Sequence, residues 1–344
     1  MELPERIRDP AHLDDLLSEP SAAAIDGIRA ADGDVLVLGA GGKMGPTLAR
    51  MARRAMDAAG LRFRIIAVAR FSSSELRHTL EAQGIETIPC DLLDETAVEA
   101  LPDAPNVVFM AGRKFGSTGD EPLTWAMNSH VPAIVCRRYR QSRIVAFSTG
   151  NVYGLTRRGR GGSREEDVPA PIGEYAMSCL GRERMFEYFS ARSGTRVAIL
   201  RLNYAVEMRY GVLVDLAQRI ASGASIDLAM GYVNVIWQGD ANAMAIAALA
   251  HAASPALILN VAGPEELSVR AISDDLARRM GSTVSFAGAE MNDALLSNAA
   301  RGYELLGTPR VDTRRLLAWT ADWVQRGGES LGKPTHFESR AGRF

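Results

Sequence analysis

The feature that most constrains this chain is a glycine-rich turn that directly follows a short apolar run. Residues 34–38 read DVLVL, and the sequence GAGGKMG comes next. Gly39 permits a sharp turn, and Gly41 and Gly42 let backbone amides come close to a bound pyrophosphate. Gly45 lets the following helix pack tightly on the strand, and the N-terminus of that helix adds positive potential. This strand–turn–helix context predicts a dinucleotide-binding site.

Apolar runs and helical periodicity alternate along the first 200 residues. Helices are predicted where apolar residues recur every three or four positions, and strands where short apolar runs lie between turns. The predicted strands are 34–38, 63–69, 86–89, 106–110, 143–147 and 196–202, and the predicted helices between them are 46–59, 74–82, 128–139 and 174–191. This alternation is typical of a doubly wound parallel sheet. We therefore expect an α/β protein with a Rossmann-like domain and a smaller C-terminal substrate subdomain.

Changes in this pattern divide the chain into four segments. They are an N-terminal extension (1–33), an NAD(P)-binding domain (34–202), a mainly substrate-binding subdomain (203–330) and a C-terminal tail (331–344). The extension is expected either to cap the edge of the sheet or to join an oligomer interface, as in a homodimer. Residues 155–171, which lack periodicity, are expected to form a surface loop, either an ordinary solvated loop or a lid.

The charge balance excludes several classes of protein. The chain has 39 Lys and Arg against 41 Asp and Glu, so its formal net charge is −2. This argues against nucleic-acid binding through a basic surface and against a polybasic membrane anchor. The first twenty residues are charged, and polar residues interrupt the longest apolar stretch, 241–262. Neither a signal peptide nor a membrane span is expected, and a cytoplasmic protein is the default.

The residues that usually bind metals or form disulfides are sparse. Three cysteines and five histidines lie far apart, so no disulfide framework and no metal site is expected. The basic residues are almost all arginine, and the only lysines are Lys43, Lys114 and Lys333. Chemistry that needs an ammonium group therefore has few candidates.

The end of the second predicted strand bears on the choice of dinucleotide. The sequence there is AVARF, which places Arg70 where the adenosine ribose of a dinucleotide would lie. Lys43 in the glycine turn could reach the same region. Two cations and no carboxylate favour NADP over NAD. The alternative is that Arg70 is an ordinary solvated arginine, which leaves NAD open.

Three motifs together resemble the extended short-chain dehydrogenase/reductases, the NAD(P)-dependent sugar epimerase/dehydratase family. They are the turn GAGGKMG, the segment STGNVYG that begins at Ser148, and the segment YAMSC that begins at Tyr175. The resemblance extends over nearly the whole chain, and the combination is far more specific than any one motif.

The resemblance implies a role for each matching residue. Tyr175 would be the general acid/base that moves a proton to or from a substrate oxygen while hydride moves to or from nicotinamide C4. Thr149 would hydrogen-bond the same oxygen. Asp91 would meet the adenine amine, and the implied substrate contacts are Asn151, Arg201 and Asn203. The implied cofactor contacts are Gly39, Gly41, Gly42, Lys43, Met44, Gly45, Arg70, Asp91, Leu92, Ala111, Gly112, Lys114, Asn128 and Cys179.

The chain departs from the family pattern Tyr-x-x-x-Lys at its last position, which is Cys179. In the family that lysine holds the nicotinamide ribose and lowers the pKa of the tyrosine through its positive charge. A thiol carries no such charge at neutral pH. Lys114 or Arg113, which follow the fourth predicted strand, could supply a substitute cation.

A second departure from the family pattern narrows the range of reactions that we expect. Gly150 and Asn151 stand where the family's dehydratases carry acidic residues for eliminating water, so a 4,6-dehydratase is not expected. We expect an NAD(P)-dependent oxidoreductase or epimerase that acts on a sugar, a sugar acid or a related small molecule. The alternative is a non-catalytic dinucleotide-binding sensor or scaffold that kept the pocket and lost the lysine.

Overall fold

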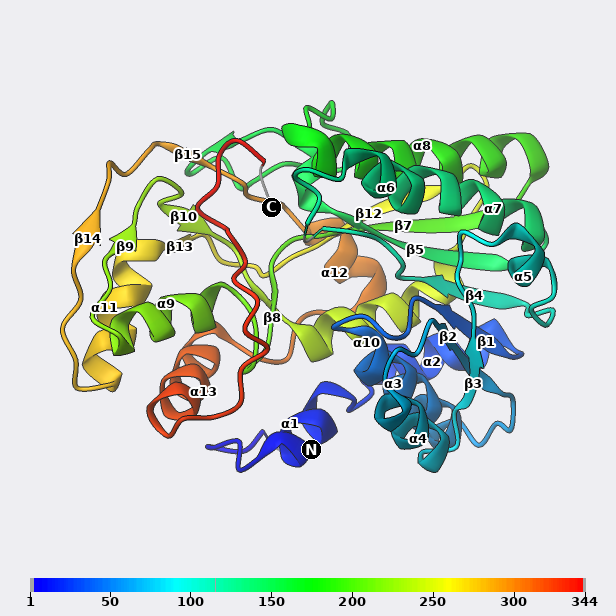
Figure 1. Ribbon diagram of the computed structural model, residues 1–344, viewed down its shortest axis with the longest axis horizontal. Helices are drawn as coiled ribbons and strands as arrows, with labels where there is room; N and C mark the ends of the chain where they lie inside the picture. Colours follow the sequence, from blue (N-terminus) through cyan, green and yellow to red (C-terminus); the bar gives the residue numbers. More distant parts are fainter. Residues whose placement is uncertain (1–2, 115, 343–344) are drawn as a thin grey trace.

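The computed structural model describes residues 3–114 and 116–342, and a seven-stranded parallel sheet lies at its centre (Figure 1). The strand order is β12-β7-β5-β4-β1-β2-β3. The strands are β1 (Val35–Leu38), β2 (Ile65–Ala69), β3 (Glu86–Pro89), β4 (Asn106–Phe109), β5 (Arg143–Thr149), β7 (Arg196–Leu202) and β12 (Leu257–Val261). The six predicted strands are confirmed, and a later apolar run supplies the seventh. The central strands are buried along their length, as expected for a parallel sheet covered on both faces.

Helices cover both faces of the sheet (Figure 1). One face carries α5 (Glu95–Glu99), α6 (Glu121–Trp125), α7 (Val131–Arg138) and α8 (Gly173–Ser193), and the other carries α2 (Ala22–Ala31), α3 (Gly45–Ala58), α4 (Ser74–Ala82) and α10 (Gln238–Ala247). Three of the four predicted helices match α3, α4 and α8. The fourth, 128–139, is divided between a π-helical turn (Ala126–His130) and α7.

The strand order places a crevice beyond the carboxyl ends of β1 and β4. From β1 the chain moves outward to β2 and β3, and it then returns to β4 on the other side of β1. The connections after β1 and β4 therefore leave the sheet toward opposite faces, which opens a ligand crevice between them. Gly39 lies at this point with φ +89°, and a Cβ on it would be 2.6 Å from the Ala111 nitrogen. The glycine turn and the segment after β4 are thus in direct contact.

The second domain has its own apolar core, which packs around α9 (Val212–Ala221), α11 (Val269–Arg279) and α13 (Thr313–Gln325). The remaining described elements are α12 (Ala300–Leu306), two 3-10 turns (Gly150–Val152 and Ala248–His251) and four short ladders. The ladders pair β8 (Ala205–Val206) with β11 (Ile236–Trp237), β9 (Ile226–Asp227) with β14 (Phe286–Ala287), β10 (Tyr232–Val233) with β13 (Leu267–Ser268), and β6 (Thr156–Arg157) with β15 (Asp293–Ala294). The predicted division after residue 202 needs one correction, because α10 and β12 return to the first domain. No helix in the described part of the chain is long and apolar enough to cross a bilayer.

The N-terminal extension adds a helix to one face of the sheet and does not cap the sheet edge. Its helices are α1 (Pro10–Leu17) and α2, and α2 packs against α3 and α10. The α2–α10 contact is so close that a Cβ on Gly27 would lie 2.7 Å from the Ala247 Cα. The Trp319 indole of α13 donates to the Pro4 carbonyl at 3.1 Å. The extension therefore joins the two domains, while its expected part in an oligomer stays a prediction.

The segment 155–171 is docked on both domains. Strand β6 pairs with β15, and the Ser163 N–H donates to the Leu296 carbonyl at 2.8 Å. The Glu165 carboxylate accepts the Asn260 N–H at 2.7 Å. None of these residues lines the cleft described below, so the structure does not support the lid alternative.

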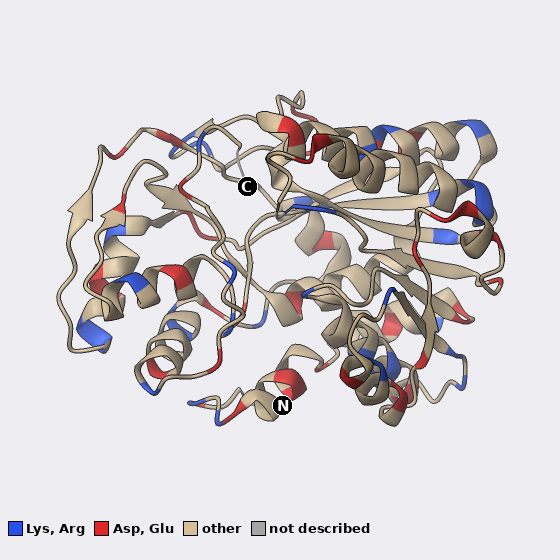
Figure 2. Cartoon of the chain, in the orientation of Figure 1, with Lys and Arg blue, Asp and Glu red and all other residues tan. Residues whose placement is uncertain are grey.

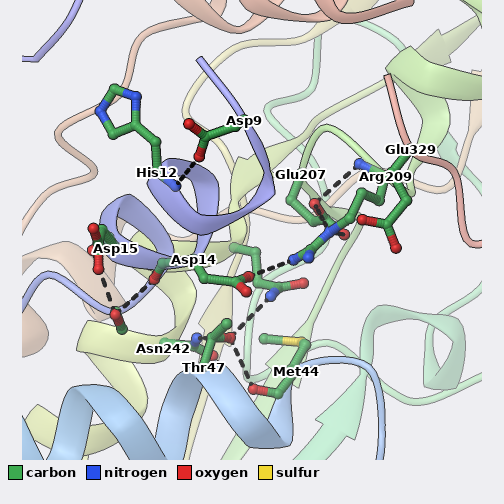
Figure 3. Close-up of polar contacts among 12 residues, drawn as sticks. Asp9, His12, Asp14, Asp15, Met44, Thr47, Glu207, Arg209, Asn242 and Glu329 are labelled. Carbon is green, nitrogen blue, oxygen red and sulfur yellow. Dashed lines mark hydrogen bonds and ion pairs between the residues drawn. The ribbon is translucent and has the colours of Figure 1, made fainter. Parts of the chain in front are cut away.

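A buried hydrogen-bond network fixes the start of α3 (Figure 3). The Thr47 hydroxyl donates to the Met44 carbonyl, and it accepts the side-chain amides of Gln238 and Asn242 from α10, all at 3.1 Å. Because Thr47, Gln238 and Asn242 are buried, the network holds the glycine turn and α10 in one arrangement.

An ion-pair cluster lies beside this network and links two parts of the chain (Figure 3). Arg209 of the second domain pairs with Asp14 of α1 at 2.8 Å and with Glu207 at 3.2 Å. The Arg209 side chain is 15% exposed and that of Glu207 is 2% exposed. This partial burial keeps solvent from screening the pair as it would on the surface.

We expect Thr47→Val to destabilise the protein by about 2–4 kcal/mol, because two buried amide donors lose their acceptor. Urea unfolding of the wild type and the variant measures this difference. Thr79→Val is the matched control, because Thr79 bonds only its own helix and is exposed, and it should change stability by less than about 0.5 kcal/mol. Equal, small effects of the two substitutions would contradict the role given to Thr47.

Candidate active site

A cleft of about 600 Å³ opens at the carboxyl edge of the sheet, between the two domains. Its walls come from the glycine turn, the ends of β2, β4, β5 and β7, the start of α8, the segment before α9, and the C-terminal tail. None of the described residues that line it is Asp or Glu. Six are cationic: Lys43, Arg70, Arg113, Lys114, Arg182 and Lys333. The cleft is therefore suited to anionic ligands.

All three lysines of the chain lie in this cleft. The other basic residues are arginines, which occur over both domains together with acidic residues (Figure 2). The ammonium groups reach the cleft from three distant places in the sequence, namely the glycine turn, the segment after β4 and the tail. The few ammonium candidates expected from the sequence are thus concentrated at one site.

The glycine turn forms a cradle at the floor of the cleft. Gly39, Gly42 and Gly45 line it, and a Cβ on Gly45 would lie 2.4 Å from the Ala40 carbonyl oxygen. The first turn of α3 has no side-chain cap, so its N–H groups are not occupied by a capping oxygen. Uncapped N–H groups at a glycine-rich helix start fit a pyrophosphate, so these residues would hold the phosphates of a dinucleotide.

Lys43 turns away from the region of Arg70. Its Nζ donates to the Ala205 carbonyl at 3.1 Å and lies 4.0 Å from the centre of the Tyr210 ring. Burial lowers the pKa of Lys43 to about 7, and the nearby Glu207 carboxylate opposes this shift. The amine of Lys43 is thus engaged with the second domain, and its expected contact with the adenosine ribose beside Arg70 stays a prediction.

The other residues expected at the adenine end are only partly brought together. Arg70 is exposed and lines the cleft. Asp91 is also exposed, but its carboxylate accepts the Leu93 N–H at 3.1 Å and does not line the cleft. Three further expected contacts also lie outside the cleft lining: Gly41, Leu92 and Ala111.

The two residues expected to carry the chemistry do meet. Thr149 ends β5, Tyr175 lies in the first turn of α8, and both line the cleft. The Tyr175 phenol is hydrogen-bonded with Thr149 and with Cys179, and the Asn151 side chain donates to the Thr149 hydroxyl at 2.9 Å. Burial raises the pKa of Tyr175 well above its usual value, and Cys179 adds to this, whereas Arg182 and the Thr149 bond lower it. The phenol is thus protonated at neutral pH.

Cys179 lies beneath the cleft and does not line it. It is completely buried and packs with Val152 and Tyr153. Burial raises the pKa of its thiol, so the group is neutral. The expected cofactor contact by Cys179 is wrong, because a side chain at this position is covered by its neighbours.

Arg201 is a structural residue and not a substrate contact. It is 2% exposed, pairs with Glu183 at 2.8 Å, and donates to the Tyr153 hydroxyl at 2.7 Å. Its expected grip on the substrate is therefore wrong. The other two expected substrate contacts, Asn151 and Asn203, do line the cleft, and Asn203 donates to the side chain of Asn234 at 3.0 Å.

Asn128 shapes the cleft from below. It is completely buried in the π-helical turn, so it does not line the cleft. Its Oδ1 accepts the Arg113 N–H at 2.8 Å and Arg182 Nη2 at 2.7 Å, and its Nδ2 donates to the Ser178 hydroxyl at 2.9 Å. Asn128 therefore holds the segment after β4 against α8, which is an indirect part in any cofactor site.

The two cations expected to replace the missing lysine are engaged elsewhere. Arg113 pairs with Asp120 at 2.9 Å and donates to the Gly116 carbonyl. The Lys114 amine donates to the Thr335 carbonyl of the C-terminal tail at 3.3 Å, and burial lowers its pKa to about 8.

Sequence reasoning missed Arg182 and the C-terminal tail. Arg182 follows Tyr175 by seven residues, which places both on one face of a helix, so this spacing was a usable signal. The tail, red in Figure 1, crosses the front of the molecule and brings Lys333 and Thr335 to the cleft. The Thr335 hydroxyl donates to Asp215 of α9, which anchors the tail. No motif in the sequence of the tail predicts this contact with the cleft.

Solved structures with the same fold include several sugar-nucleotide enzymes. MoeE5 in complex with UDP-glucuronic acid and NAD is 21% identical, with a TM-score of 0.70 over 86% of this chain and 99% of that one. A UDP-glucuronic acid 4-epimerase from Bacillus cereus is 17% identical, with a TM-score of 0.71 over 85% and 99%. DesIV, a dTDP-glucose 4,6-dehydratase from Streptomyces venezuelae with NAD and TYD bound, is 17% identical, with a TM-score of 0.73 over 86% and 97%.

The family assignment rests on sequence as well as on fold. A search of curated proteins found no match. The family model described as "NAD dependent epimerase/dehydratase family" matches residues 35–231, which is more than half of the chain and includes the glycine turn, Thr149 and Tyr175. The chain therefore belongs to the NAD-dependent epimerase/dehydratase family.

Proposed function

We propose that this protein is an NAD(P)-dependent oxidoreductase or epimerase that acts on a sugar or sugar derivative, with Tyr175 and Thr149 as its acid–base pair. The observation that carries the proposal is that these two side chains meet in the cleft that the glycine turn also lines. Family membership supports the use of a dinucleotide.

The expected chemistry assigns a distinct task to each group. A bound nicotinamide dinucleotide supplies or accepts a hydride. The Tyr175 phenol gives a proton to the substrate oxygen when a carbonyl is reduced, and its phenolate takes the proton when an alcohol is oxidised. Thr149, oriented by the Asn151 side chain, hydrogen-bonds the same oxygen. At neutral pH the phenol is thus in the form that gives a proton to a carbonyl oxygen.

The charge of the cleft supports an anionic substrate. Six cationic side chains and, among the described lining residues, no carboxylate face a space of about 600 Å³. A sugar nucleotide carries a diphosphate that would complement this charge, and related structures hold UDP-glucuronic acid or UDP-glucose. The lack of a carboxylate in the described lining also argues against eliminating water, which needs an acid and a base near the sugar.

The identity of the dinucleotide depends on Arg70. The relatives named above hold NAD. One of the two cations that favoured NADP, Lys43, is engaged with Ala205. We therefore favour NAD as the cofactor, and the alternative, NADP, rests on Arg70 alone.

Turnover tests the function. With NAD and a panel of nucleotide sugars and free sugars, the wild type should form NADH or convert one sugar isomer into another, read by absorbance at about 340 nm and by chromatography. Tyr175→Phe should lower the rate at least about a hundredfold, because proton transfer contributes that much or more. Thr149→Val should lower it about tenfold, through one lost hydrogen bond.

The control for Tyr175→Phe is Tyr188→Phe, on the same helix but 52% exposed, which should keep full activity. NAD affinity should change less than about threefold in both variants, since neither hydroxyl is assigned to the dinucleotide. Equal activity of the two variants would refute the assignment of Tyr175. Tight NAD binding without turnover of any sugar would favour the sensor or scaffold alternative.

Arg70→Asp should weaken NADP binding at least tenfold more than NAD binding, because a charge-assisted contact with the 2′-phosphate contributes about 1.5–3 kcal/mol. Calorimetric titration of the two cofactors measures this. Arg62→Asp is the control, since Arg62 is exposed and lies just before β2, at the end of that strand remote from Arg70. Equal losses for NAD and NADP would show that Arg70 does not read the 2′-phosphate.

Gly45→Ala should weaken NAD binding at least tenfold, because the added Cβ would meet the Ala40 carbonyl oxygen at 2.4 Å and shift the cradle. Gly154→Ala is the control, because its Cβ would meet Ala170 only at an ordinary 3.4 Å. Calorimetry with NAD and a melting curve for each variant separate lost binding from lost folding. Unchanged NAD affinity in a folded Gly45→Ala protein would contradict the cradle.

A further inference from the structure

We propose that the Arg182 guanidinium supplies the positive charge that stabilises the ionised form of Tyr175, a task for which position 179 offers no cation. Arg182 would act through Tyr175 and not on the substrate itself. The inference rests on the proposed acid–base role of Tyr175.

The geometry of α8 brings the two side chains to the same cleft. With about 3.6 residues per turn, positions 175, 179 and 182 fall on one face of the helix. Helical side chains lean toward the N-terminus, so a long side chain at 182 extends back past position 179 toward position 175. Tyr175 and Arg182 both line the cleft, whereas Cys179 between them is completely buried.

The guanidinium is held in place but lacks an anion. Arg182 is only 6% exposed. Its Nη1 donates to the Phe147 carbonyl at 2.8 Å and its Nη2 to Asn128 Oδ1 at 2.7 Å, while its buried Nε has no hydrogen-bond partner. Within the part of the chain that the structure describes, no carboxylate forms an ion pair with it. A buried cation without a counterion is costly, so a negative charge that forms in the cleft is stabilised there.

The neighbouring carboxylate does not neutralise Arg182. Glu183 follows it directly, but its oxygens accept hydrogen bonds from Arg201 at 2.8 Å and from the Ser148 hydroxyl. The Glu183 side chain is completely buried in this pair. The charge of Glu183 is thus balanced by Arg201, and the charge of Arg182 remains available to the cleft.

The fold reserves space for the guanidinium. A Cβ on Gly112 would lie only 2.3 Å from Arg182 Nη2, so any larger residue at position 112 would displace the end of the arginine. Gly112 was expected to serve a cofactor, and the structure gives it this second reason to be glycine.

The other ionisable groups around Tyr175 do not supply this charge. Cys179 is neutral, Arg113 is paired with Asp120, the charge of Lys114 acts on the Cys179 thiol, and Lys43 lies near Glu207. The charge of Arg182 lowers the pKa of Tyr175, against the larger effect of burial, which raises it.

The rate of substrate oxidation between pH 7 and 9.5 tests the inference. Below the pKa of the phenol, this rate rises with pH in proportion to the phenolate fraction. Arg182→Gln keeps an amide that can donate to Phe147 or Asn128 but removes the charge, so it should raise the pKa by about one unit or more and lower the rate about tenfold at every pH. Arg182→Lys, which keeps the charge, should stay within about threefold of the wild type.

A double variant separates charge from structure. Cys179→Lys in the Arg182→Gln background restores a cation one turn earlier on the same face, and it should recover most of the lost oxidation rate. A tenfold weaker NAD affinity with an unchanged pH profile would overturn the inference and make Arg182 a structural or phosphate-binding residue.

A direct titration keeps the test independent of turnover. The phenolate absorbance of the cofactor-free protein, minus that of Tyr175→Phe, reports Tyr175 alone. Arg182→Gln should move this titration to higher pH, and Gly112→Ala should do the same by displacing the guanidinium while Arg182 is still present. If neither variant moves the titration, the inference fails. If they do move it but no sugar is turned over, the proposed function fails and the inference stands.

Discussion

The close approach of the glycine turn to the segment after β4 is the contact on which the rest of the site depends. Gly39 adopts φ +89° with no room for a Cβ beside Ala111, and Gly45 packs just as tightly on Ala40. These contacts bring β1, β4 and the uncapped start of α3 to one point, and the buried Thr47 network ties that point to α10. The cleft lies where these elements converge, at the point where the strand order reverses.

The charges and the burial of the groups in this cleft then determine which ligands it suits and which proton transfer it supports. An almost neutral chain, with a net charge of −2, places six cations and no carboxylate in the described lining of one cleft. Anionic ligands would complement these charges. The same setting keeps Tyr175 protonated, because the pKa-raising effect of burial exceeds the lowering effects of Arg182 and Thr149. The fold thus places ligand binding and proton transfer in the same cleft.

Much of this arrangement was predictable from the sequence, because local patterns carry it. The apolar runs and the glycine turn predicted the sheet and the cradle, and the spaced motifs brought Thr149 and Tyr175 together. The directions in which long side chains point could not be predicted from the sequence. Lys43 turns to Ala205 and Arg201 is buried against Glu183, since a flexible cation follows tertiary partners that no local pattern encodes. The return of β12 to the sheet and the path of the tail also depend on contacts distant in sequence.

A crystal structure with NAD bound tests the central claim most directly. We predict that the pyrophosphate lies on the amides of the turn from Gly39 to Gly45, that the adenosine end reaches Arg70, and that the nicotinamide lies against Tyr175 and Thr149. A nicotinamide bound at the Arg70 end, or a dinucleotide bound outside this cleft, would contradict it, because Tyr175 would then be too far from the hydride to share in its transfer.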